Sequence, residues 1–297
     1  MLVDEKLKIA DRELQFRYLL KSPVRYACKR VFELFPKSAG VPVHSSILVD
    51  ILDRPSGGVV FPNGKLLVDG KLWTLSKKGQ YLFLRMVSPD NYAVGMEAII
   101  SPERNKVKVF LDTPWAGQNG FVSAWNLLFQ IIFRASLDAE CEQFVKGMGI
   151  VVKNKGFLVN TCANSKTAQI VDALKKRFLL LGQNRLLLRK QEDEFYLYAT
   201  PWTRNAALAS CCANFRLDNM VLIGTKSSEG VVMLDSKKVI EHFAPIGADS
   251  AYHDFSDEKH SLLENVEAFG LPRGPEELVT AALIRMAEMG SLSPTSS

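Results

Sequence analysis

Residues 149–167 read Gly149-Ile150-Val151-Val152-Lys153-Asn154-Lys155-Gly156-Phe157-Leu158-Val159-Asn160-Thr161-Cys162-Ala163-Asn164-Ser165-Lys166-Thr167, and this stretch decides the fold. Two short apolar runs on either side of a turn predict a β-hairpin. The second run leads into a polar segment that ends in Lys166-Thr167, and a helix is predicted over residues 168–174. A strand, a polar Lys-Thr loop and a helix are the context of a phosphate-binding loop, because a helix N-terminus offers free N–H groups to an anion.

The rest of the C-terminal half continues this alternation of short strands and helices. Strands are predicted at 178–181, 185–189, 195–198, 220–223 and 231–234, and helices at 236–243 and 275–289. Such an alternation is typical of an α/β fold. We therefore expect an α/β core over residues 145–297.

The N-terminal half shows different patterns. Apolar residues recur at steps of three and four between residues 4 and 35, as at Leu7, Ala10 and Leu14, which predicts two helices. Short β-like runs follow at 59–61, 65–68, 71–75, 81–87 and 107–111, and a buried helix pair is predicted over 121–144. We expect a helical and β-rich region at 1–144, which can pack with the core at 145–297 as one unit.

The composition is that of a globular protein whose stability needs neither a disulfide nor a metal ion. Of its 297 residues 47% are hydrophobic, and 37 Lys and Arg stand against 32 Asp and Glu. The net charge of +5 is spread along the chain, so nucleic acid is not an expected partner. The four histidines lack a metal-binding spacing, so no metal site is expected.

The expected location is the cytoplasm. Five cysteines without a Cys-x-x-Cys pair favour a reducing compartment. The N-terminus carries acidic residues early and lacks the long apolar segment of a secretory signal. The most apolar stretch, 124–133, is too short to cross a bilayer, so no membrane span is predicted.

The region from residue 149 to 202 resembles the HPr kinase-like family, bacterial P-loop proteins that include HPr kinase/phosphorylase and are related to ATP-dependent phosphoenolpyruvate carboxykinase. The resemblance lies in the order of features. A Gly-containing hairpin feeds a Walker A position, and a Leu180-Leu181-x-x-x-Arg185 Walker B position follows the helix. An aromatic strand then ends in the corner Thr200-Pro201-Trp202. The resemblance implies an HPr kinase-like P-loop core behind a β-rich and helical N-terminal region.

The loop departs from the pattern that the resemblance implies, which is Gly-x-x-Gly-x-Gly-Lys-Ser/Thr. In that pattern, glycines let backbone N–H groups curl around a phosphate, while the lysine neutralises charge and the hydroxyl holds magnesium. Here Asn160, Ala163 and Ser165 stand at the glycine positions, and Lys166 and Thr167 remain. Side chains at those positions strain the backbone or crowd the phosphates, so we expect a weakened site.

The carboxylates of the family are also absent. The resemblance implies consecutive Asp residues after the Leu-Leu strand, where one orders magnesium and another accepts a hydroxyl proton. This chain has Gln183 and Asn184, whose amides neither hold a divalent ion strongly nor take a proton near neutral pH. Arg185 either reaches the anion or, as we favour, lies on the strand surface. The histidine often found ahead of the hairpin is missing, with Val145 and Lys146 near that position.

The predicted function is that of a catalytically degenerate, pseudokinase-like protein that binds a protein or peptide partner or regulates one. No catalytic residue is assigned, and enzyme activity is not expected. Residual binding of ATP or phosphate is assigned to Asn160, Ser165, Lys166, Thr167, Gln183, Asn184 and Arg185. One alternative is an active ATP-dependent kinase of a serine-bearing protein or peptide, with Asp172 or the acids at 192–194 binding magnesium. Another is a homo-oligomeric scaffold whose interfaces contain Trp202 and the helix around Trp125.

Overall fold

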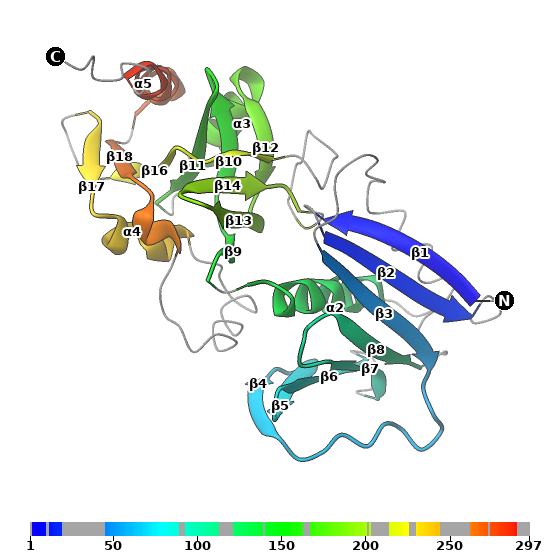
Figure 1. Cartoon of the computed structure of the whole chain (residues 1–297). Coiled ribbons are helices and arrows are strands. Elements are labelled where there is room, and N and C mark those ends of the chain that lie inside the picture. The colour runs from blue at the N-terminus through cyan, green and yellow to red at the C-terminus, as the bar shows by residue number, and fades with distance from the viewer. Residues whose placement is uncertain are drawn as a thin grey trace. The chain divides into compact units, whose positions relative to one another are not determined.

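A computed structural model describes residues 2–9, 12–19, 45–88, 93–112, 121–138, 140–162, 167–200, 202, 214–225, 230–243, 262–272 and 274–289. The chain is an α/β protein with mixed sheets (Figure 1). Its contacts divide it into two compact units, one of residues Met1–Leu137 and one that begins at Asp138. Within the described ranges, each helix is too short or too polar to cross a membrane.

The first unit is an eight-stranded sheet packed against a helix. Its elements are β1 (Leu2–Ile9), β2 (Arg12–Leu19), β3 (Ser45–Asp53), β4 (Lys65–Asp69), β5 (Trp73–Lys78), β6 (Tyr81–Val87), β7 (Val94–Ile100), β8 (Lys106–Leu111) and α2 (Phe121–Ala135). The strand order is β1-β2-β3-β8-β7-β6-β5-β4. Strand β3 pairs in parallel with both β2 and β8, and the other neighbours in the sheet are antiparallel.

The helix predicted near the N-terminus is wrong, because that segment forms β1 and β2. Leu7 and Ile9 on β1 are buried, as are Leu14, Phe16 and Tyr18 on β2. The buried positions alternate, which is the two-residue period of a strand with one covered face. The spacing that suggested a helix joins buried residues of two different strands, which meet in the pair Leu7↔Leu14. The second predicted helix, within 24–35, lies outside the described residues.

Four of the five β-like runs in this unit are confirmed as β4, β5, β6 and β8. The fifth, 59–61, is not a strand, and Val60 is 91% exposed. Strand β7 was not predicted, and it contains Glu97, a fully buried carboxylate. A charged residue in the middle of an apolar run conceals the strand pattern, although here the charge is paired with arginines.

Helix α2 confirms the first half of the predicted helix pair, whereas the second half is wrong because residues 142–145 form a strand. Trp125 has no exposed surface, and its ring lies 5.5 Å from that of Phe121 and 5.2 Å from that of Phe129. Phe129 also contacts Phe16 of β2, with ring centroids 4.9 Å apart. Trp125 is therefore a core residue of this unit, and the oligomer interface suggested for the helix around it stays a prediction.

The second unit contains two sheets with helices around them. Its elements are β9 (Glu142–Val145), β10 (Met148–Val152), β11 (Lys155–Thr161), α3 (Thr167–Arg177), β12 (Leu179–Gln183), β13 (Leu186–Gln191), β14 (Glu194–Tyr198), β15 (Asn214–Arg216), β16 (Asn219–Thr225), β17 (Val232–Leu234), α4 (Ser236–Phe243), η3 (Leu262–Asn265), β18 (Ala268–Pro272) and α5 (Glu276–Met289). The predicted strands and helices of this region are confirmed, while β15, β18 and η3 were not predicted. The expected domain boundary at 144–145 falls within β9, which pairs with β13, and the domain assignment stays a prediction.

The larger sheet has the order β12-β10-β11-β16-β18-β17, and the smaller one has the order β15-β14-β13-β9. Strand β10 is antiparallel to both β11 and β12, so β11 and β12 run in the same direction. Strands β16 and β18 follow that direction as well. The carboxyl ends of these four strands therefore lie at one edge, which is where ligands bind in open α/β sheets.

Two apolar cores hold this unit together. One lies between the two sheets and beneath α4, and it includes Leu158, Leu197 and Phe243. The other lies between the larger sheet and helices α3 and α5, and it includes Leu174 and Leu283. Gly156 brings the sheets close together, because a Cβ atom there would lie 1.9 Å from the carbonyl oxygen of Arg216.

Candidate functional site

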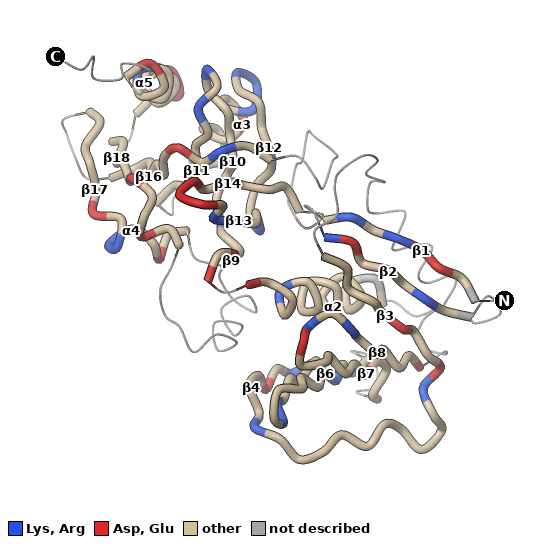
Figure 2. The backbone as a smooth tube through the Cα atoms, in the orientation of Figure 1, with Lys and Arg blue, Asp and Glu red and all other residues tan. Residues whose placement is uncertain are grey.

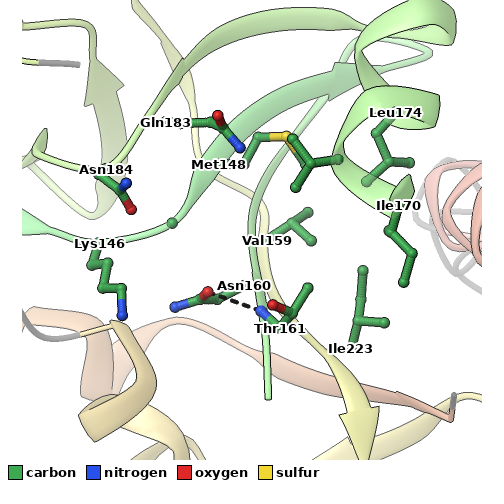
Figure 3. Close-up of a pocket in the computed structure, with 12 residues that line it drawn as sticks. Lys146, Met148, Val159, Asn160, Thr161, Ile170, Leu174, Gln183, Asn184 and Ile223 are labelled. Carbon is green, nitrogen blue, oxygen red and sulfur yellow. Dashed lines mark hydrogen bonds between the residues drawn. The ribbon is translucent and has the colours of Figure 1, made fainter. Parts of the chain in front are cut away.

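A cavity of about 290 Å³ opens at the carboxyl edge of the larger sheet, beside α3. It is lined by Lys146, Gly147, Met148, Val159, Asn160, Thr161, Ile170, Val171, Leu174, Gln183, Asn184 and Ile223. Figure 3 shows two distinct sides. Lys146, Asn160, Gln183 and Asn184 lie on the polar side, and Ile170, Leu174 and Ile223 lie opposite them.

The polar side forms where the chain crosses twice between the two sheets. Lys146 and Gly147 join β9 of the smaller sheet to β10 of the larger one, and Asn184 lies on the return from β12 to β13. The two crossings are tied by a 2.7 Å hydrogen bond from the Asn184 N–H to the Gly147 carbonyl oxygen. Gly147 has a φ of 153°, and a Cβ atom there would lie 2.7 Å from Leu158 Cδ1. Glycine thus allows the close approach that places Lys146 at the cavity.

The second crossing is a tight turn with two left-handed residues. Asn184 has a φ of 57° and Arg185 a φ of 49°. Asparagine adopts this conformation more readily than most residues, so Asn184 has a backbone role as well as a place in the cavity wall. The hydroxyl of Thr200 donates a 2.6 Å hydrogen bond to the Arg185 carbonyl oxygen. Thr200, the first residue of the Thr-Pro-Trp corner noted in the sequence, therefore holds this turn.

The prediction that Asn160 takes the place of a loop glycine is wrong, because Asn160 is a strand residue. It lies within β11 in register with Leu222 of β16. Its side-chain amide donates a hydrogen bond to the His242 carbonyl oxygen at the end of α4, and its Oδ1 accepts one of 2.8 Å from the Thr161 N–H. The Lys146 N–H donates to the next α4 carbonyl, that of Phe243, at 2.7 Å. The Asn160 amide and the Lys146 N–H therefore each satisfy one carbonyl at the end of α4, where carbonyls lack partners within the helix.

The structure brings together three of the predicted site residues, Asn160, Gln183 and Asn184, in one cavity wall. Thr167 begins α3, while Ser165 and Lys166 lie outside the described residues. Arg185 was expected on a strand surface, but it is a half-buried turn residue and does not line the cavity.

Lys146 is the functional candidate that the sequence did not reveal. Among the twelve described residues that line the cavity, it is the one charged side chain. Its sequence neighbours give no motif, and its place depends on two sheet crossings that meet only in the fold. The adjacent Gly147, with no side chain at a strand entrance, was the one available signal.

The described residues of the lining can neutralise an anion, and none of them is a carboxylate that could bind a divalent cation. Their polar groups are an ammonium, amides and hydroxyl or backbone groups, which are typical partners of phosphates and carboxylates. Elsewhere in the described ranges, no group of three or more histidine, cysteine, aspartate or glutamate side chains is arranged to hold a metal ion.

Comparisons with solved structures give a distant likeness. No protein-family model and no curated protein matches the chain. Among solved structures, it is similar to the HPr(Ser) kinase/phosphatase from Coxiella burnetii, with a TM-score of 0.32 and 9% sequence identity over 50% of this chain and 98% of that chain. At this level of similarity nothing about the cavity is carried over from that protein, and function has to be argued from the residues themselves.

Proposed function

We propose that the second unit is a catalytically degenerate P-loop protein of the HPr kinase-like type that acts in the cytoplasm through a protein or peptide partner. It retains at most weak binding of ATP or phosphate. One observation carries this proposal: Gln183 and Asn184 line the same cavity as the end of β11 and the helix α3. The family resemblance puts magnesium-binding carboxylates at these two positions, and amides there can supply neither the metal ligand nor the base.

The phosphate side of the proposal rests on the order of strand, loop and helix. Strand β11 ends at Thr161 and α3 begins at Thr167, with the loop that contains Lys166 between them. The first turn of α3 carries no acidic residue, so nothing there opposes an anion at the helix N-terminus. This arrangement supports weak binding of a phosphate group.

Two of the acids that the kinase alternative names, Asp172 and Glu194, are engaged elsewhere. Asp172 is an exposed residue of α3 and lies 3.5 Å from the Lys175 ammonium. Glu194 accepts hydrogen bonds from Arg216 at 2.8 Å and from the Tyr196 hydroxyl at 2.7 Å. Neither acid lines the cavity, so no observation favours the kinase alternative.

The test is calorimetric titration of the full chain with ATP, with and without magnesium. We expect weak binding that does not need magnesium and is reduced in Lys166→Ala. The matched control is Lys176→Ala, which removes an exposed lysine from α3 without touching the cavity. Strong, magnesium-dependent binding together with transfer of labelled phosphate to a serine-bearing protein would contradict the proposal and establish the kinase alternative.

A reversal variant tests descent from a kinase core. It combines Gln183→Asp and Asn184→Asp with Ala163→Gly and Ser165→Gly. Asn160 is left unchanged because its hydrogen bond to α4 is structural. A gain of magnesium-dependent ATP binding supports the P-loop assignment. If the folded variant gains none, the cavity is not a decayed kinase site.

A further inference from the structure

We propose that the cavity binds a small amphiphilic anion without a metal ion, and that Lys146 supplies the opposing charge. The inference rests on the proposed function only in treating this cavity as a ligand site. It names a ligand class and a cation that the P-loop resemblance does not supply.

The charge of the lining points to an anion. Lys146 is half-buried, and the other described residues that line the cavity are uncharged. Amide groups of Gln183 and Asn184 lie on the same side as its side chain (Figure 3). An ammonium beside neutral hydrogen-bonding groups recognises a phosphate or a carboxylate, and such charge-assisted hydrogen bonds are stronger than neutral ones. Because none of the described lining residues is a carboxylate, the cavity offers no magnesium ligand, and we expect the anion to bind without that metal.

The opposite wall of the cavity is apolar and favours an apolar ligand group. Ile170 and Leu174 project from successive turns of α3, and Ile223 joins them from β16. Met148 and Val159 are buried at 3% and 2% exposure and form the floor between the two sides. A purely ionic ligand such as free phosphate would leave this apolar surface without a partner, whereas a short hydrocarbon chain would cover it.

The size of the cavity limits the ligand. At about 290 Å³ it lies at the lower end of the usual range for ligand sites, which is about 300–1,000 Å³. A short acyl or alkyl chain with one anionic headgroup suits this volume better than a whole nucleotide.

The polar side is already held in place. Backbone hydrogen bonds fix Lys146 to the end of α4 and join Asn184 to Gly147, each at 2.7 Å. The backbone of these residues is therefore fixed before a ligand enters, so binding costs side-chain freedom but no rearrangement of the two crossings.

The experiment uses the full chain and three matched probes, hexanoate, hexyl phosphate and hexan-1-ol, titrated calorimetrically in EDTA. We expect at least one anion to bind and the neutral alcohol to bind far more weakly. Comparison of the two anions identifies the headgroup. Acetate is expected to bind less tightly than hexanoate by roughly fourfold for each buried methylene that it lacks.

Two variants and a control identify the cation. Lys146→Met keeps the apolar stem and removes the charge, and we expect it to weaken anion binding by roughly 10- to 100-fold. Lys146→Arg should retain most of the affinity, and Lys176→Met should change nothing. Equal binding of anion and alcohol, a requirement for magnesium, no binding of either anion, or full affinity in Lys146→Met would each overturn the inference.

The outcomes separate this inference from the proposed function. Hexanoate or hexyl phosphate binding that persists in Lys166→Ala while ATP binding is absent would refute residual nucleotide binding and support the role of Lys146. ATP binding that depends on Lys166 with no binding of either probe would do the reverse.

Discussion

Glu97 in the first unit and Lys146 in the second unit are both charged residues that the fold shields from water, but their surroundings differ. Glu97 is paired with opposite charges, whereas Lys146 faces a cavity. Glu97 is fully buried, and its two oxygens accept hydrogen bonds from Arg54 at 2.9 Å and Arg85 at 3.0 Å. The Val59 N–H adds a third at 3.2 Å. Lys146 instead lines a cavity whose other residues, as far as the structure describes them, include no acid. A paired buried charge fixes the fold, whereas a charge left open to a cavity is available to a ligand.

The two units also differ in how charge is spread over their strands. Figure 2 shows acidic and basic residues side by side on β1, β2 and β3. They pair across strands, as Lys6 with Glu13 at 2.8 Å and Arg17 with Asp50 at 2.6 Å. These pairs are partly exposed, so each contributes little to stability. Charges of opposite sign are thus paired across β1, β2 and β3 of the first unit, whereas the cavity lies in the second unit.

The largest effect is expected where both members of an ion pair in the second unit are buried. Arg189 lies 2.5 Å from Glu142, and both side chains are at least nine-tenths buried. Arg189→Met would leave Glu142 without its charge partner and remove the guanidinium from the Tyr198 ring, 5.1 Å away. We expect a loss of about 4 kcal/mol in the free energy of unfolding, measured by urea denaturation.

A double variant separates pairing from packing in that experiment. Glu142→Gln with Arg189→Met removes both charges, so it should recover part of the stability that the single variant loses. If the single variant is as stable as the wild-type chain, the pair has no structural role, and the contrast with Lys146 fails.

The next largest effect is expected at Glu97. Glu97→Ala would leave Arg54 and Arg85 without their shared partner, although their side chains are 24% and 42% exposed and regain some water. We therefore expect a loss of about 3 kcal/mol in unfolding free energy, at the lower end for a broken buried pair. The control is Glu103→Ala, an exposed acid in the turn between β7 and β8, which should change stability by less than about 0.5 kcal/mol. A similar loss in both variants would show that burial and pairing at Glu97 do not matter.

These same residues show what the sequence could reveal of the fold. In the second unit, short apolar runs between turn residues specify local strands and helices, because each run is buried whichever sheet it joins. In the first unit, the correct period for Leu7, Ile9, Leu14 and Phe16 is two, and the competing three- and four-residue steps came from residues on different strands. Strand β7 was missed because the partners of Glu97 lie on other strands and in a loop.

The candidate site was predictable only in part. Gln183 and Asn184 were assigned because the family resemblance puts carboxylates at these positions after the Leu-Leu strand, and both residues line the cavity. Two features of the site depend on contacts between distant segments. One is the hydrogen bond from Asn160 to the end of α4, and the other is the turn in which Asn184 and Arg185 are both left-handed. Lys146 was missed for the same reason, since only the meeting of two sheet crossings gives it a place in the wall.

A small effect on stability is expected at Lys146 itself. Lys146→Met should change the unfolding free energy by less than about 0.5 kcal/mol, because a ligand-binding charge contributes little to the empty protein. The contrast with Arg189→Met is the measurement that matters, since both substitutions replace a long cation by methionine in the same unit. A loss above about 1 kcal/mol would mean that Lys146 stabilises the carboxyl end of α4, as cations at helix C-termini do.

The smallest effect concerns Cys141, which lies beside the Arg189 and Glu142 pair. Burial, with a hydrogen bond to Asp138, raises the pKa of its thiol from 9.0 to about 11. The folded chain therefore keeps the thiol proton at pH values where the unfolded chain has lost it, so stability should fall slightly as pH rises from about 9 to 11.

Because the thiolate is the nucleophile, alkylation of Cys141 by iodoacetamide should be slow at pH 8 and accelerate toward pH 11. Peptide mapping of folded and urea-unfolded protein, with Cys141→Ser as the control, measures this. Equal alkylation of Cys141 in the folded and the urea-unfolded protein at pH 8 would show that the fold around the Arg189 and Glu142 pair does not protect this thiol.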